Sequence, residues 1–294
     1  MTRILSVQSE VSYGFVGNSA VVFALRRIGV DVWPVNTVQF SNHTGYPSWR
    51  GPRLTPIDEA EIVRGLDELG ILGQLDGVLT GYLSGPSMGR QIMAAVQLVK
   101  RRRPTALYCC DPVLGDDETG FYAAPGTLEL FREQALPLAQ VITPNRFELA
   151  ALTNLPTSSL EEILIAADTL LDAGPSTVVV TSVPSLRPSQ GAGHDDRIAM
   201  VAVQRDGAWQ VSTPRLPGEF SGAGDLTSAL FFAHSLAGKA PARPCPTPPV
   251  RSTACWVPRS RQVVANSNWL PPSGNWSTPR PSSRPSGCAS GMCP

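Results

Sequence analysis

SGAGDLTSALFF, residues 221–232, places two glycines directly before an apolar run with helical character. A helix that opens on glycines presents backbone N–H groups and the positive end of its dipole, which together favour an anion. Asp225 would lie in the first turn beside that anion, where its carboxylate could accept a proton from an alcohol. A base, a nucleophile and a stabilised phosphate are the components of phosphoryl transfer. Taken alone, the motif is equally compatible with an ordinary glycine-rich loop capped by Asp225.

The chain before this motif alternates strand-like and helix-like segments. Apolar runs predict strands at residues 4–7, 30–38, 77–82, 106–111, 141–144, 177–181 and 198–203. Amphipathic stretches predict helices at residues 18–28, 57–72, 86–103 and 160–173, with Asn18 as an N-cap and Gly29 as a C′ residue. This alternation predicts an α/β fold with a mostly parallel central sheet and helices on both faces. Ligands of such sheets bind beyond the carboxyl ends of the strands.

The composition excludes several classes of protein. The 294 residues carry a formal net charge of zero, so no nucleic-acid partner is expected. No apolar run reaches the ~18 residues that a membrane span needs. The N-terminal MTRILSVQSE lacks the long apolar region and cleavage site of a signal peptide, and we interpret it as the first strand of a cytoplasmic protein.

Residues 240–294 differ in composition from the rest of the chain. They hold 12 of the 28 prolines, 4 of the 6 cysteines and 3 of the 6 tryptophans, but no Asp, Glu, Lys, Ile or Phe. Proline at this density blocks helices and central strands, so we expect a disordered or poorly packed tail. Two origins are open: a natural low-complexity extension, or a reading-frame change that replaced the original C-terminus. The composition favours the frame change.

A set of ordered motifs runs through residues 1–239. They are Ser6-Val-Gln-Ser9, Tyr13-Gly14, Gly17-Asn-Ser-Ala20, Val32-Trp-Pro-Val-Asn-Thr-Val-Gln-Phe-Ser-Asn-His-Thr44, Gly81-Tyr-Leu83, Cys110-Asp-Pro-Val-Leu-Gly115, Ala124-Pro-Gly126 and Thr143-Pro-Asn-Arg-Phe-Glu148. With the GAGD sequence at residues 222–225, they closely resemble the pyridoxal kinases of the ribokinase-like superfamily. The resemblance implies a ribokinase-like kinase domain over residues 1–239, which acts as a homodimer.

The resemblance also implies a substrate pocket for pyridoxal. Ser9 resembles the residue that hydrogen-bonds the pyridine ring, and His43, Thr44 and Gly45 resemble the loop that contacts the ring and its substituents. Tyr82 resembles the aromatic wall of the pocket, a suitable surface for a flat heteroaromatic ligand. Without the resemblance, turn hydrogen bonding would explain Ser9 and Thr44, and core packing would explain Tyr82.

ATP as phosphate donor and Mg²⁺ follow from the same resemblance, and a monovalent cation is a further candidate. Asp111 is expected near the ATP phosphates and the metal, and Asn145 with Glu148 resembles the element that organises Mg²⁺ and its waters. Asn145 as N-cap with Glu148 at N3 also fits a capping box, and both roles can hold together. Thr143 and Thr181 resemble residues that contact the nucleotide.

The implied reaction is ATP-dependent phosphorylation of the 5′-hydroxymethyl group of pyridoxal to form pyridoxal 5′-phosphate in salvage, with pyridoxine and pyridoxamine as further candidate substrates. Asp225 would accept the hydroxyl proton, and the backbone amides of Gly222, Ala223 and Gly224 would stabilise the developing charge. The stretch 116–122 resembles the loop that closes over the active site, although its acidic residues are also typical of a solvated turn.

Two other functions compete with this one. A hydroxymethylpyrimidine kinase is the alternative within the superfamily, and a non-catalytic pyridoxal-binding remnant is the alternative outside catalysis. The second rests on residues 240–294, which supply no amphipathic helix where relatives continue with helices that pack on the sheet. Losing several hundred Å² of buried apolar area costs many kcal/mol, so we expect a chain of low stability and activity.

Overall fold

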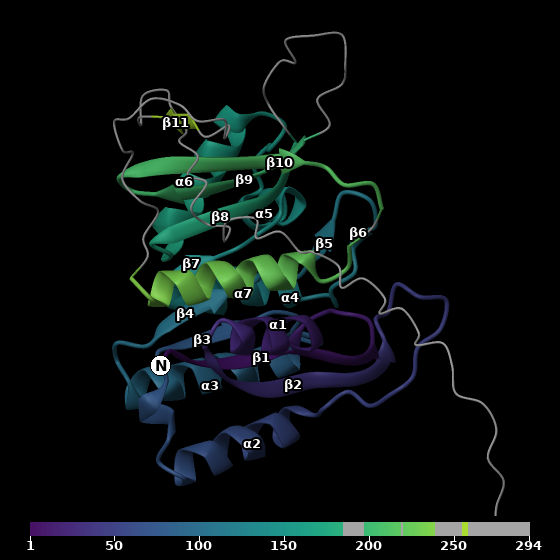
Figure 1. The fold of residues 1–294 in the computed structure, drawn as a ribbon, viewed down its shortest axis with the longest axis vertical. Helices are drawn as coiled ribbons and strands as arrows, with labels where there is room; N and C mark the ends of the chain where they lie inside the picture. Colours follow the sequence, from purple (N-terminus) through teal and green to yellow (C-terminus); the bar gives the residue numbers. More distant parts are fainter. Residues whose placement is uncertain (185–196, 219, 239–254, 258–294) are drawn as a thin grey trace, which may run out of the picture.

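The computed structural model describes residues 1–184, 197–218, 220–238 and 255–257. A nine-stranded sheet crosses the molecule in the order β11-β10-β9-β8-β7-β4-β3-β1-β2 (Figure 1). Its strands are β1 (Arg3–Tyr13), β2 (Asp31–Asn42), β3 (Gly77–Thr80), β4 (Leu107–Cys110), β7 (Val141–Ile142), β8 (Thr177–Pro184), β9 (Arg197–Gln204), β10 (Gly207–Pro214) and β11 (Cys255–Val257). A separate two-stranded hairpin joins β5 (Gly115–Asp116) to β6 (Gly120–Phe121).

Six neighbouring strands of the large sheet run parallel, and the pairs β8–β9, β9–β10 and β10–β11 are antiparallel. The mostly parallel sheet predicted from the alternating pattern is therefore confirmed. Parallel strands bring their carboxyl ends to one edge of the sheet. Ser9 near the end of β1, Asp111 after β4 and Thr143 after β7 all lie toward that edge.

Helices cover both faces of the sheet. The near face in Figure 1 carries α1 (Asn18–Arg27) and α7 (Ala223–Leu236), which pack against each other. The far face carries α2 (Pro56–Glu68), α3 (Pro86–Arg102), α4 (Thr127–Leu130), α5 (Arg146–Thr153) and α6 (Leu160–Ala173). Short helical turns lie at Leu72–Gln74, Phe131–Ala135 and Leu136–Leu138.

Side chains of the central strands alternate between two apolar cores. In β3, Val78 packs into the core beneath α3 and α6, while Leu79 packs into the core beneath α1 and α7. In β4, Cys110 packs into the core beneath α3 and α6, and Cys109 packs into the core beneath α1 and α7. Strands that are buried on both faces read as continuous apolar runs, which is why these segments were predictable from sequence.

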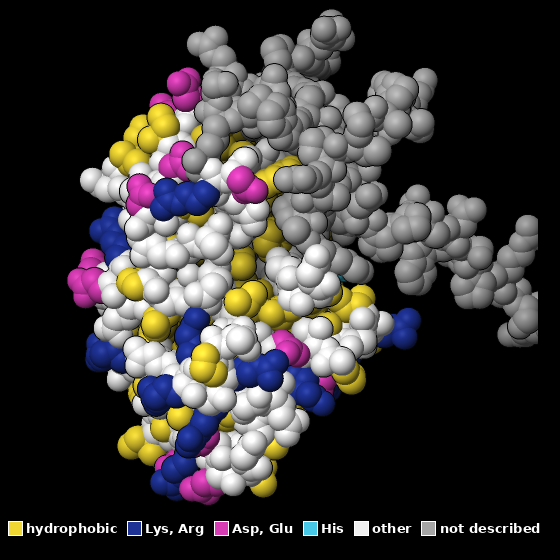
Figure 2. All heavy atoms as spheres, turned by 90° about the vertical axis from the view of Figure 1, so that its left-hand side faces the viewer, with side chains coloured by type: hydrophobic (Ala, Val, Ile, Leu, Met, Phe, Trp, Pro, Cys, Tyr) yellow, Lys and Arg dark blue, Asp and Glu magenta, His cyan; other side chains and the backbone are white. Residues whose placement is uncertain are grey.

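The opposite edge of the sheet is lined by exposed ion pairs. Arg3 pairs with Asp31 at 3.6 Å and Arg103 pairs with Asp76 at 3.6 Å, at the amino ends of β1, β2 and β3. Figure 2 shows basic side chains on this side of the molecule with acidic ones among them. Solvated pairs of this kind contribute little to stability. The chemistry concentrates instead at the carboxyl edge.

Several details differ from the sequence predictions. Asn18 is not the N-cap of α1: Gly17 is, and the buried Asn18 amide donates to Val35 O at 3.2 Å and Asn36 Oδ1 at 2.8 Å. Gly29 does take the left-handed conformation after α1, with φ of 84°. The apolar pattern missed α4, β10 and the β5–β6 hairpin, which are short or only partly buried, and of α5 only the capping box at its start was predicted.

Part of the atypical tail forms a strand that the proline content did not predict. Residues 255–257 pair antiparallel with β10, with Val257 opposite Ala208 and Cys255 opposite Gln210. Residues 240–254 and 258–294 lie outside the described residues, so the expectation of disorder there stays a prediction. Among the described helices, none is both long and apolar enough to cross a membrane.

Candidate active site

The glycine-rich loop is held against a second loop from the N-terminal strand. Gly222 is the N-cap of α7 with φ of 84°, and no side chain caps the helix there. A Cβ atom at Gly222 would lie 1.7 Å from Phe15 O, so only glycine fits. The loop that follows β1 and the loop that opens α7 are thus in direct backbone contact.

Asp225 lies in the first turn of α7, as the sequence predicted. The Gly17 N–H donates to its carboxylate, which lowers the pKa of Asp225, but burial raises that pKa by more. Gly17 in turn packs on Ser9: a Cβ at Gly17 would lie 2.4 Å from Ser9 Oγ. The structure therefore brings together Ser9, Gly17 and Asp225.

Asp111 follows β4 and faces α7. Ser228 Oγ donates to Asp111 Oδ2 at 2.8 Å, and Thr143 Oγ1 lies 2.8 Å from the same Ser228 Oγ. Burial raises the pKa of Asp111 to about 7, and the negative charge of Asp225 adds to the rise, while Ser228 and Thr143 oppose it. Two carboxyl groups that disfavour each other's ionisation therefore share this edge.

Asn145 and Glu148 form the predicted capping box at the start of α5. The Asn145 side chain accepts from Glu148 N at 2.9 Å, and Glu148 Oε2 accepts from Asn145 N at 2.8 Å. Glu148 Oε1 also accepts from Leu114 N at 2.9 Å, and Asn145 Nδ2 donates to Gly115 O at 2.7 Å. Burial, followed by the charge of Asp111, raises the pKa of Glu148 well above its usual value.

These oxygen donors suit a hard divalent cation. The buried carboxyls of Asp111 and Glu148 would ionise more readily beside a positive charge, and magnesium prefers oxygen ligands and retained water. Within the described ranges, no group of three or more His, Cys, Asp or Glu side chains could enclose a metal by itself. The site therefore suits a cation whose remaining ligands are phosphate oxygens and water. Asn145 would hold Glu148 in place.

Thr181 joins the same edge from β8. Its N–H donates to Pro144 O at 2.9 Å, and its backbone pairs with Asn145 in an isolated parallel bridge. Thr143 and Asn145 thus lie on a segment parallel to that of Thr181, and the nucleotide contacts expected of Thr143 and Thr181 stay a prediction.

The turn after β2 carries three of the residues expected to bind substrate, His43, Thr44 and Gly45, and it contacts the loop that opens α7. His43 Nδ1 accepts from Gly45 N at 3.1 Å, and His43 Nε2 lies 3.3 Å from Ser221 Oγ. A neutral ring that accepts at Nδ1 carries its proton on Nε2, so Ser221 Oγ is the acceptor. Thr44 is exposed on the same turn, and its role stays a prediction.

Tyr82 lies after β3 and packs against the small apolar cluster of Val11, Val38 and Phe40. Its hydroxyl accepts from Arg53 Nη1 at 3.3 Å, and its carbonyl accepts from Thr37 Oγ1 at 3.0 Å. Packing thus fixes one side of the ring. This is expected both if Tyr82 forms a wall of the substrate pocket and if it only packs in the core.

Two comparisons with known proteins identify the family of this chain. The phosphomethylpyrimidine kinase family model matches residues 74–244. A pyridoxal kinase, PdxY, of Rubrobacter xylanophilus is 51% identical over 237 residues, which is 81% of this chain and 80% of that protein. This chain belongs to the pyridoxal kinase family.

The fold of this chain is also similar to that of solved structures of related kinases. A pyridoxal kinase from Leishmania donovani in complex with ADP and pyridoxamine matches with a TM-score of 0.73 at 32% identity, over 79% of this chain and 82% of that chain. A putative phosphomethylpyrimidine kinase from Bacteroides thetaiotaomicron matches with a TM-score of 0.72 at 28% identity, over 81% and 80%. The ribokinase-like fold expected for a pyridoxal kinase is therefore confirmed.

Sequence reasoning missed three residues that organise this pyridoxal kinase site. Ser228 connects Asp111 to Thr143, Gly17 connects Asp225 to Ser9, and Ser221 connects the glycine loop to His43. Ser228 had a usable signal, because it lies three residues after Asp225 and therefore on the same face of α7. The other two depend on contacts between segments far apart in sequence.

Proposed function

We propose that this chain transfers the γ-phosphoryl group of ATP to the 5′-hydroxymethyl oxygen of pyridoxal, and that Asp225 is the base. The observation that carries the proposal is the position of Asp225. It lies in the first turn of the glycine-opened α7, with the Gly17 N–H on its carboxylate and Asp111 close enough to interact with its charge. The family membership supports the choice of substrate.

The chemistry follows from the raised pKa of Asp225. Burial raises the pKa of this carboxylate toward that of an effective base near neutral pH, and the Gly17 N–H, which favours the ionised form, opposes part of the rise. Asp225 takes the hydroxyl proton, the oxygen forms a bond to the γ-phosphorus, and the bond from that phosphorus to ADP breaks. Phosphorylated pyridoxal and ADP then leave.

The start of α7 supplies the stabilisation of charge. The backbone amides of Gly222, Ala223 and Gly224 were expected to face the phosphate. Ala223 N already donates to Phe220 O at 3.1 Å, so we assign the main share to Gly222 and Gly224, together with the helix dipole.

Magnesium is proposed at the neighbouring oxygen donors. Asp111 would hold it, Glu148 would hold its water, and Asn145 would keep Glu148 in place. When bound, the cation would neutralise phosphate charge. Thr143 and Thr181 are proposed to contact the nucleotide, and a monovalent cation is a further candidate that rests on the family resemblance.

For the substrate side, we propose that Ser9 hydrogen-bonds the pyridine ring. His43, Thr44 and Gly45 would contact the ring substituents, and Tyr82 would line one side. The ring of His43 is fixed by Gly45 and Ser221, and Tyr82 is fixed by its apolar cluster. Pre-positioned contacts of this kind reduce the entropy cost of binding.

The assembly and the location of the protein also remain proposals. A kinase domain over residues 1–239 and a homodimer rest on the resemblance to pyridoxal kinases, and the cytoplasmic location rests on the interpretation of residues 1–10 as a first strand. The atypical tail, residues 240–294, gives the competing proposal of a pyridoxal-binding remnant without turnover.

A substrate panel tests the function. Purified chain would be given ATP, magnesium and one of pyridoxal, pyridoxine or hydroxymethylpyrimidine, and ADP and phosphorylated product would be measured. We expect the highest kcat/KM with pyridoxal. The name of the matching family model, phosphomethylpyrimidine kinase, keeps the pyrimidine as the second candidate. Binding of pyridoxal without ADP formation would instead support the remnant.

A further inference from the structure

The β5–β6 hairpin is too short to hold itself in place. Its strands pair Gly115 with Phe121 and Asp116 with Gly120. Its turn is closed by Asp116 Oδ1, which accepts from Glu118 N at 3.0 Å and from Thr119 N at 2.7 Å. An isolated two-stranded hairpin is marginally stable at best, so its position must come from contacts outside it.

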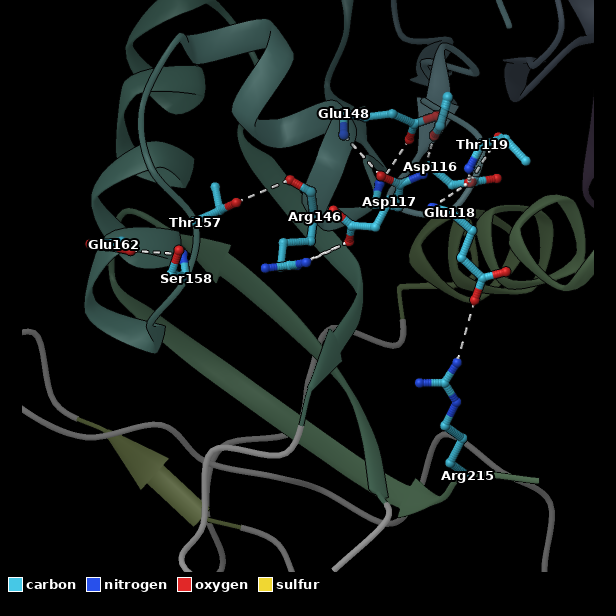
Figure 3. Close-up of polar contacts among 12 residues, drawn as sticks. Asp116, Asp117, Glu118, Thr119, Arg146, Glu148, Thr157, Ser158, Glu162 and Arg215 are labelled. Carbon is cyan, nitrogen blue, oxygen red and sulfur yellow. Dashed lines mark hydrogen bonds and ion pairs between the residues drawn. The ribbon is translucent and has the colours of Figure 1, made fainter. Parts of the chain in front are cut away.

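Those contacts come from the first turn of α5. Asn145 Nδ2 donates to Gly115 O, and Glu148 accepts from Leu114 N, so the base of the hairpin is fixed. The tip is fixed by Arg146, whose Nη2 lies 2.6 Å and Nε 3.2 Å from Asp117 Oδ2 (Figure 3).

An aromatic pair continues the same arrangement. The ring of Phe121 meets the ring of Phe147, the residue after Arg146, edge to face at 4.9 Å between centroids. Base, tip and returning strand of the hairpin therefore all rest on consecutive residues of one helix.

The hairpin carries Tyr122 to the carboxylates. Tyr122 follows β6, and its N–H donates to Leu114 O at 3.0 Å, which ties the residue to the start of the outgoing strand. Burial raises the pKa of the Tyr122 phenol, and the charges of Glu148, Asp116, Asp111 and Asp225 raise it further. The phenol therefore lies near enough to these carboxylates to be affected by their charge, although half of the residue is exposed to solvent. Any movement of the hairpin moves this group.

We propose that Arg146 is a positioning residue for phosphoryl transfer, which acts by holding the hairpin closed beside the carboxylates through its ion pair with Asp117. Arg146 is 27% exposed and Asp117 is 50% exposed, so the pair is partly shielded from solvent. The inference rests on the proposed kinase function, because closure of the hairpin would keep water from the phosphoryl group.

A second ion pair provides a matched control. Arg215, after β10, lies 3.8 Å from Glu118 on the same hairpin, with the two side chains 59% and 71% exposed (Figure 3). The longer and more exposed pair should contribute close to nothing. Arg215→Gln therefore removes an arginine that faces the hairpin without removing its anchor.

The first measurement is amide hydrogen exchange over residues 115–122 in the full chain without ligands. In Arg146→Gln and Asp117→Asn, exchange should be faster by about fivefold. In the charge swap, Arg146→Glu with Asp117→Arg, it should return to within about twofold of wild type, as it should in Arg215→Gln. Unchanged exchange in Arg146→Gln, or no recovery in the swap, would overturn the inference.

The second measurement is the ratio of ADP to pyridoxal phosphate formed. An open hairpin admits water, so Arg146→Gln should raise this ratio and the swap should restore it. Faster exchange with an unchanged ratio would contradict a positioning role. If the wild-type chain forms no pyridoxal phosphate, the proposed function fails; the exchange experiment then still decides whether Arg146 holds the hairpin.

Discussion

Ser228 donates a hydrogen bond of 2.8 Å to Asp111, although 117 residues separate them. Asp111 follows a central strand and Ser228 lies one helical turn beyond Asp225, so the bond connects the proposed metal side of the site to the proposed base. A buried carboxyl needs such donors in order to ionise. The contact therefore favours the ionised form of Asp111 against burial and the charge of Asp225, which both raise its pKa.

Removing that donor should make the reaction more sensitive to acid. Burial already raises the pKa of Asp111 to about 7, and Ser228→Ala removes a group that lowers it. The ionised form then appears only at higher pH. We expect kcat/KM at pH 7 to fall about tenfold and to recover in alkaline buffer. Ser235→Ala, which removes a hydroxyl bonded to Phe231 O on the same helix, is the control. An unchanged pH profile in Ser228→Ala would contradict this role.

Gly222 should tolerate no side chain. Its positive φ and the 1.7 Å approach of a Cβ to Phe15 O combine strain with a backbone collision. Gly222→Ala should therefore lower the free energy of unfolding by about 3 kcal/mol or more. Gly224→Ala is the control for stability, since a Cβ there meets nothing within 4 Å. Urea unfolding of both variants gives the comparison, and equal stabilities would show that the loops can separate without cost.

His43 and Ser221 should act as a unit. Their contact of 3.3 Å joins the turn after β2 to the glycine loop. We expect His43→Ala and Ser221→Ala each to lower kcat/KM for pyridoxal, and the double variant to lose less than the product of the two effects. A coupling of about 1 kcal/mol is reasonable for one partly exposed hydrogen bond. Independent, multiplicative losses would mean that the contact does not operate in the working enzyme.

Glu59 should make the fold less stable as the pH rises. Its side chain on α2 is fully buried, and neither carboxylate oxygen has a hydrogen-bond partner of good geometry among the described residues. Burial raises its pKa from 4.5 to about 7, with a smaller opposing effect from Gln91. The folded state therefore holds a proton that the unfolded state releases above pH 4.5.

Because the unfolded state binds fewer protons than the folded state in this range, the free energy of unfolding should fall by about 3 kcal/mol between pH 4.5 and 7. It should level off above pH 7. Glu59→Gln should flatten this slope, as measured by urea unfolding at pH 5 and pH 8. Glu61→Gln, which changes an exposed carboxylate on the same helix, should leave it in place. If the free energy of unfolding still falls with pH in Glu59→Gln, another group causes the pH dependence.

The sequence predicted the elements whose patterns are strong and local. Val78 and Leu79 are both apolar because β3 is buried on both faces, so a continuous run was visible. Asn145 and Glu148 were recognisable as a capping box from their spacing alone. By contrast, Asn18 had the residue type of an N-cap, but tertiary contacts with Ser6, Val35 and Asn36 took its side chain into the core.

Some site residues also had a local sequence signal, whereas others depend on contacts between distant segments. Asp225 was predictable because a glycine pair and a helix pattern surround it in sequence. The contact between Gly222 and Phe15, and the bond between Ser228 and Asp111, depend on how distant segments meet. Spacing along the chain carries no signal for such pairs. Composition likewise did not predict β11, because a short strand needs only three residues of backbone beside β10.

The central claim is that Asp225 removes the proton from the alcohol of pyridoxal while ATP provides the phosphoryl group. Single-turnover formation of pyridoxal phosphate, with pyridoxal affinity measured in parallel, tests it in wild type and Asp225→Ala. We predict product from the wild type, a fall in rate of about 10²–10⁴-fold in the variant, and an affinity that changes little. Near-normal turnover in Asp225→Ala, or a wild-type chain that binds both substrates and forms no product, would contradict the account.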